Sequence, residues 1–181
     1  DVSNVTNFGS MFSFARSFDQ SLSSWNTSSA TSMIAMFESC DVFNQDITGW
    51  NTSGVENMSS MFVNAKLFNQ DIDGWDVSSV TNMSSMFNNS DAFNQDLNSW
   101  TTSSVTNMAN MFQFNGGFNG NIAGWDTSNV TDMGSMFAGA SVFNKDLSGW
   151  TVNPNVTDCA SFDLNTTAWV LPRPNFTSCT I

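Results

Sequence analysis

The sequence predicts an α/β solenoid, in which every repeat adds a short strand and a short helix or helical turn. Three columns of aromatic residues recur with a spacing of 25 residues and are the observations that predict it. A constant period of this length is typical of repeats that bury their apolar side only against their neighbours. The columns are Trp25, Trp50, Trp75, Trp100, Trp125 and Trp150; Phe12, Phe37, Phe62, Phe87, Phe112, Phe137 and Phe162; and Phe18, Phe43, Phe68, Phe93, Phe118 and Phe143.

Each repeat contains two patterns in succession. Ile72, Trp75 and Val77 alternate with polar residues, which predicts a short strand. After a turn at 78–81, apolar and small residues follow at the spacing of one helix face. That face consists of Met83, Met86, Phe87 and Ser90. If the repeats stack in register, the strands form a parallel ladder with a rise of about 5 Å per repeat.

The chain divides into two parts. Residues 1–150 are a repeat solenoid of six 25-residue units, which begins in mid-repeat, so we expect a processed or truncated chain. Residues 151–181 are a degenerate last repeat and C-terminal cap, giving about seven repeats in all. We expect a disulfide between Cys159 and Cys179 to staple the cap, and we expect Cys40, which lies in a column of small residues, to be a buried free thiol.

Charge and composition exclude several classes of function. Sixteen acidic and four basic residues give a net charge of −12, so no basic footprint exists for nucleic acid or for an anionic membrane. The chain has no histidine, which removes the common nucleophile pairs and zinc sites, and we expect neither an enzyme nor a cofactor. A polar, uncharged surface favours an extracellular or cell-surface location without membrane insertion.

Two polar columns follow the second phenylalanine of each repeat. We expect an asparagine column to form an internal ladder that bonds successive repeats through its amides; its members are Asn44, Asn69, Asn94, Asn119 and Asn144. An aspartate column two residues later consists of Asp46, Asp71, Asp96 and Asp146. Asx turns are the simpler explanation of these carboxylates, and calcium binding is the alternative.

The position after each tryptophan faces outward by strand alternation and is the candidate ligand-binding face. It contains Asn51, Asp76, Thr101 and Asp126. Asn-x-Ser/Thr triplets also recur, and such asparagines are candidate attachment points for glycans. The candidates are Asn4, Asn26, Asn51, Asn88, Asn129, Asn155, Asn165 and Asn175.

The repeat Trp-[Asp/Asn/Thr]-[Val/Thr]-Ser-x-Val-Thr-[Asn/Asp]-Met-x-x-Met-Phe, followed by Phe-Asn-Gln-Asp, closely resembles the BspA-like leucine-rich-repeat surface proteins over residues 1–150. It is most similar to the branch described as a Mycoplasma-type surface lipoprotein domain of unknown function. Local departures include Asn115-Gly116-Gly117 in place of the small-residue segment. The resemblance implies a leucine-rich-repeat-like, right-handed coil that serves adhesion or cell-envelope architecture.

From these observations we expect an extracellular structural or adhesive repeat protein. One form of it would be a glycosylated subunit of a surface filament in which copies associate head-to-tail. Its partners would be further copies of itself, other surface proteins or glycans. The alternative is a cell-surface ectodomain that recognises a glycan or a protein through the outward face.

Overall fold

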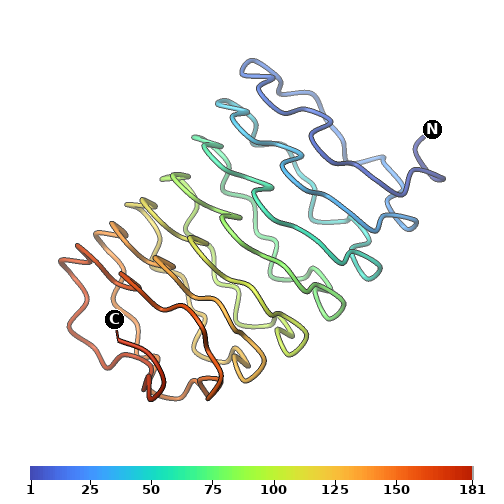
Figure 1. Ribbon diagram of the computed structural model, residues 1–181. Coiled ribbons are helices and arrows are strands. Elements are labelled where there is room, and N and C mark those ends of the chain that lie inside the picture. Colours follow the sequence, from blue (N-terminus) through green and yellow to red (C-terminus); the bar gives the residue numbers. More distant parts are fainter. Residues whose placement is uncertain (181) are drawn as a thin grey trace.

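A computed structural model describes residues 1–180 as a row of stacked coils, each of which makes one circuit of the chain (Figure 1). We number the coils by the residues that end at each tryptophan: 1–25, 26–50, 51–75, 76–100, 101–125 and 126–150, with 151–180 as the seventh. Residues 1–180 contain no helix and no strand, only turns, bends and isolated bridges. The predicted α/β class, with its strand ladder and short helices, is therefore wrong, and a leucine-rich-repeat solenoid is not supported. The same residues contain no helix that is long and apolar enough to cross a membrane.

The segment predicted as a helix is a run of β-turns. The N–H groups of Met86, Asn88 and Ser90 donate to the carbonyl three residues earlier, at 3.1–3.3 Å. Ser85 and Asn89 have positive φ angles of 57° and 54°, which the third residue of a type II turn requires. Two left-handed residues within five positions interrupt a right-handed helix. The apolar side chains of this segment still point into the core, which explains why the sequence carries a helix-like pattern.

The alternate N–H groups of this segment connect the coils. Met83, Ser85, Phe87 and Asn89 donate to carbonyl groups 24 residues later, at 2.8–2.9 Å. Along residues 85–90, backbone N–H groups therefore alternate between an acceptor in the next coil and an acceptor in their own coil. Because only half of them reach the next coil, no regular ladder forms.

In the described part of the chain, residues 1–180, parallel bridges exist only as single residue pairs, at a place other than the predicted strand. They join Asn7, Ser32, Asn57, Asn82, Asn107, Asp132 and Asp158 in succession. In the predicted strand segment, Trp75 N–H donates to the carbonyl of Ile72, so a turn occupies a donor that a strand would offer to its neighbour. Val80 N–H donates to the carbonyl of Val77, which closes a second turn at the predicted place.

The core consists of aromatic columns stacked in register along the row of coils. The Trp50 and Trp75 rings are 6.4 Å apart and inclined by 3°, and those of Phe62 and Phe87 are 5.7 Å apart and inclined by 5°. Within one coil, Phe62 also stacks on Phe68 at 4.0 Å. Both phenylalanine columns are fully buried from the second coil onward, and the column tryptophans from Trp50 onward are only 3–4% exposed.

Buried polar groups fix the register of the columns. The Nε1–H of Trp75 donates to the carbonyl of Ile47 in the preceding coil at 3.2 Å, and later tryptophans repeat this bond. Thr52 Oγ1 donates to the carbonyl of Asp76 in the following coil at 2.9 Å, and Thr27, Thr102 and Thr127 do the same. A slip by one residue would leave these buried groups without partners, which is costly.

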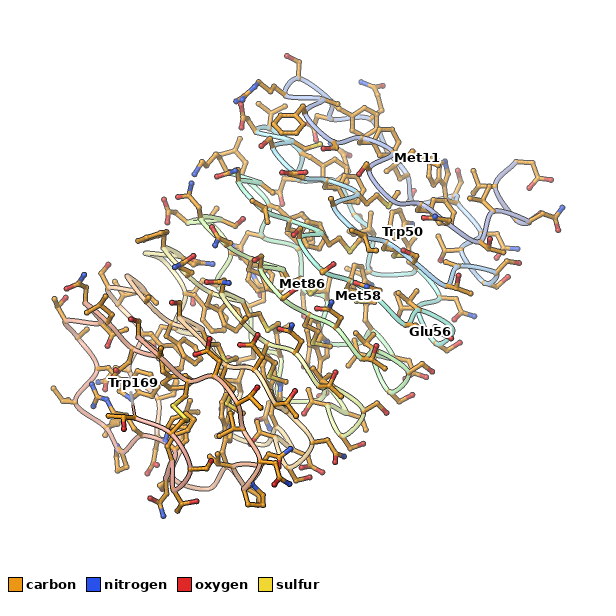
Figure 2. All side chains as sticks on the ribbon, in the orientation of Figure 1. Met11, Trp50, Glu56, Met58, Met86 and Trp169 are labelled. Atoms are coloured by element: carbon orange, nitrogen blue, oxygen red, sulfur yellow. A yellow bond between two sulfur atoms is a disulfide. The ribbon has the colours of Figure 1, made fainter. Side chains whose placement is uncertain are left out.

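The seventh coil covers the end of the core. The insertion at 153–155 lengthens the bridge step from 25 residues to the 26 that separate Asp132 from Asp158. The aromatic stack then ends in perpendicular contacts, with the rings of Phe143 and Trp169 at 84°. Arg173 lies over the Trp169 ring and forms an ion pair with Asp163. Figure 2 shows Trp169 within this last part of the row.

The predicted disulfide is present. Cys159 and Cys179 are bonded, with their Cα atoms 6.1 Å apart. Cys40 is a buried free thiol whose Sγ donates to the carbonyl of Phe12 at 3.0 Å. Burial raises the pKa of this thiol to about 11, so it stays protonated at neutral pH.

Candidate functional sites on the coil surface

The predicted ligand-binding column is exposed at all of its positions: Asn51, Asp76, Thr101 and Asp126. Its acidic and amide members are held in Asx turns. Ser78 donates to Asp76 Oδ1 through its hydroxyl at 2.6 Å and its N–H at 3.0 Å, and Ser53 does the same to Asn51. Hydrogen bonds from the hydroxyl and then the N–H of Ser78 lower the pKa of Asp76, and those of Ser128 lower the pKa of Asp126. The column therefore presents oriented, ionised carboxylates to solvent.

The aspartate column is also exposed, and its side chains accept bonds within the protein. Asp46, Asp71 and Asp146 accept the N–H two residues later, and Asp96 accepts the N–H of Asn121 in the next coil at 2.6 Å. The hydroxyl and N–H of Thr48 lower the pKa of Asp46, and those of Ser148 lower the pKa of Asp146. Among residues 1–180, no group of three acidic or cysteine side chains could hold a metal ion. The turns account for these carboxylates, and the calcium alternative has no donor cluster.

The asparagine column forms a continuous ladder, but at the surface rather than inside. Asn69, Asn94, Asn119 and Asn144 each donate their backbone N–H to Oδ1 of the previous column member at 2.7–2.9 Å. The side-chain carbonyl of one coil therefore replaces a backbone acceptor for the next. Asn44 and Asn94 are exposed and the other three half-buried, which corrects the predicted internal position.

The glycosylation candidates differ in accessibility. Asn88 is half-buried, and its Nδ2, the atom that would carry a glycan, donates to Gln113 Oε1 at 2.9 Å. Asn129 is exposed, yet its Nδ2 donates to the carbonyl of Ser103 at 2.8 Å. The remaining candidates are exposed: Asn4, Asn26, Asn51, Asn155, Asn165 and Asn175.

One exposed feature, which we name the Phe114 loop (residues 114–117), was not predicted from the sequence. Phe114 has a φ of 55° and is 57% exposed. Other coils have Ser39, Asn64, Asn89 or Gly139 at this place, and only Phe14 repeats the phenylalanine. The signal was available in the Asn115-Gly116-Gly117 departure and in a phenylalanine outside the three aromatic columns.

These features define a repeat protein whose coils stack through aromatic columns, with polar columns on its surface. The chain belongs to the family described as "Mycoplasma protein of unknown function, DUF285", which matches residues 1–100 and 70–170. No curated protein matches the chain. No solved structure matches it either.

Proposed function

We propose that the chain is an extracellular structural or adhesive repeat protein. The observation that carries this proposal is the uniformity of the coil-to-coil bonding. The same tryptophan, threonine and asparagine bonds recur from coil to coil, so the molecule is an extended object with the same surface columns along its length. Extended surfaces are what such repeat proteins use to bind partners.

An oxidising, extracellular location is supported by the disulfide of the seventh coil, because such bonds persist in secreted proteins. Six exposed sequons without a competing bond at Nδ2 agree with a glycosylated form. For the filament form we propose head-to-tail association between copies. Because the seventh coil covers the end of the core, this contact would include residues of that coil such as Arg173.

The experiment is intact mass spectrometry of native material together with negative-stain imaging of the same sample. Excess mass in hexose units and regular filaments are the expected result. An unmodified, monodisperse monomer at high concentration would contradict the filament form.

The second candidate function is a ligand-binding ectodomain. It is favoured by the orientation of Asp76 and Asp126, which point ionised carboxylates into solvent one coil away from Thr101. The double variant D76S/D126S keeps a side-chain oxygen acceptor at each turn, removes both charges and creates no Asn-x-Ser/Thr triplet. Loss of a pull-down partner in this variant would favour the second candidate over the structural one.

A further inference from the structure

The Phe114 loop places an aromatic ring where the fold does not need one. A bulky residue with positive φ is a genuine outlier, and Phe114 does not offset this strain by burial because it is more than half exposed. Asparagine at the same place in the third and fourth coils adopts this conformation readily. Every coil has a positive φ at this place, so the turn imposes the backbone conformation, and the unusual feature is an exposed phenylalanine in it.

Glycines hold the ring in place. A Cβ on Gly139 would lie 2.6 Å from Phe114 Cδ1, so the ring packs directly against the backbone of the next coil. A Cβ on Gly117 would lie 2.0 Å from the carbonyl oxygen of Asp91, so the loop closes on the previous coil in a way that only glycine permits. The ring is thus fixed on one side and open to solvent on the other.

The glycine part of the loop, two residues after Phe114, is flanked by groups that bind hydroxyls. Asp91 accepts the Gly116 N–H at 2.8 Å through Oδ1. A Cβ on Gly116 would lie 3.5 Å from both Asp91 Oδ1 and Ser141 Oγ, so these two exposed side chains flank the loop from either side. A carboxylate is a strong hydrogen-bond acceptor, and a serine hydroxyl both donates and accepts.

We propose that the Phe114 loop is a binding subsite for a neutral, β-linked hexose polysaccharide. Sugars of this kind have equatorial hydroxyls and an apolar face of axial C–H groups, which packs on the electron-rich face of an aromatic ring. Asp91 and Ser141 receive hydroxyls at the edge of the sugar. The net charge of −12 disfavours acidic polysaccharides as the ligand. The inference rests on the adhesive form of the proposed function and names its ligand.

Phe14 is the matched control. It occupies the same place in the first coil, with a φ of 60° and an exposed fraction of 61%. Its surroundings differ, because Ser39 replaces the glycine of the next coil and an Arg16–Asp41 ion pair of 2.9 Å replaces Gly116 and Ser141. It therefore has a ring of similar exposure without the cradle or the free hydroxyl-binding groups.

The test is native affinity electrophoresis in gels that contain hydroxyethyl cellulose, glycol chitin or laminarin. The variants are F114N and F14N, since asparagine suits the backbone at this place and both variants are expected to fold. We expect at least one polysaccharide to slow the migration of the wild type and of F14N. The retardation of F114N in the same gel should be at least fivefold smaller. D91N, which keeps the acceptor for Gly116, is expected to lie between them.

The outcomes separate the site from the function. Retardation of the wild type that F114N retains would overturn the site and leave adhesion standing. A wild type that none of the three polysaccharides retards would overturn the proposal, while the structural role would still be decided by mass and imaging. Retardation lost equally in F14N and F114N would also overturn it, since exposed phenylalanine in general would then be responsible.

Discussion

Ser60 has a positive φ of 59°, and Ser59 beside it does not. Each coil repeats this arrangement with two left-handed residues four positions apart, and the residues concerned are serine, asparagine, alanine, phenylalanine and glycine. A left-handed conformation costs a residue with a Cβ about 1–2 kcal/mol, whereas glycine adopts it freely. The turns that connect the coils therefore contain strain at defined positions.

Replacing Ser60 by glycine should raise the free energy of unfolding by about 1 kcal/mol, because it removes this strain. The control S59G changes a residue without positive φ and should lower the free energy of unfolding by about 0.5–1 kcal/mol. Urea denaturation of both variants measures the difference. Equal destabilisation by the two glycines would contradict the conformational account.

Ser78 should control the pKa of Asp76, because its hydroxyl and N–H bond the ionised carboxylate. Because the pKa of Asp76 is lower in the folded state than in the unfolded state, its ionisation stabilises the fold at pH values above the unfolded-state pKa. This stabilisation is lost as the pH falls through the folded-state pKa. In S78A the pKa of Asp76 should move up toward its ordinary value in an NMR pH titration. S79A is the control, since the Ser79 hydroxyl donates to the Ser53 carbonyl instead. An unchanged pKa in S78A would refute the assignment.

At the scale of the element, the columns could be predicted from the sequence and the backbone could not. Stacking of Trp on Trp and Phe on Phe follows from the period alone, and the Cys159–Cys179 bond from the position of both residues beyond the repeat. The turns could not be predicted, because serine and asparagine occur in this segment both with positive and with negative φ, and the sequence does not distinguish the two. The Phe114 loop could have been noticed from Asn115-Gly116-Gly117 and from a phenylalanine outside the three columns, but the exposure of its ring depends on the turn and could not be predicted.

The asparagine ladder provides a test of coil-to-coil bonding at the surface. N94A removes the acceptor of the Asn119 N–H and should lower the free energy of unfolding by about 0.5–1.5 kcal/mol. N94D keeps an acceptor oxygen at the same place and should retain most of the stability. Chemical denaturation at pH 7 compares the two variants; if N94A matched the wild type, the ladder would be an incidental contact.

The disulfide should stabilise the seventh coil mainly by restricting the unfolded chain. Its two cysteines are 20 residues apart, and a loop of that size is worth about 3 kcal/mol. A reductant should therefore lower the unfolding midpoint of the wild type, while the double variant C159A/C179A should not respond to it. C40A, which retains the bridge, should still respond. A wild type insensitive to full reduction would show that packing alone holds the seventh coil.

At the scale of the whole molecule, stability is distributed along a row in which each coil contacts only its neighbours. Phe87 illustrates this, because its ring contacts Phe62 in the coil before, Phe112 in the coil after, and Phe93 within its own coil. Figure 2 shows Met58 and Met86 in successive coils of the same central region. A defect at this place should affect three coils and leave distant coils intact.

F87A should lower the free energy of unfolding by about 3–5 kcal/mol, because it leaves a cavity inside the stack. Hydrogen exchange should show the loss of protection centred on residues 51–125. F12A is the control, since Phe12 is only partly buried in the first coil and its removal should cost less. Uniform loss of protection over residues 1–180 in F87A would indicate a single cooperative unit instead of a row of coupled ones.

The direction of the coil-to-coil bonds has a mechanical consequence. Because the hydrogen bonds of residues 83–89 join one coil to the next, tension between the two ends of the row loads the interfaces in series, so each carries the full force and the coils detach one after another. A coil that detaches releases 25 residues, which is about 80–90 Å of extended chain. The molecule would lengthen under load in repeated, nearly equal steps and recover by rewinding, as an extensible tether does.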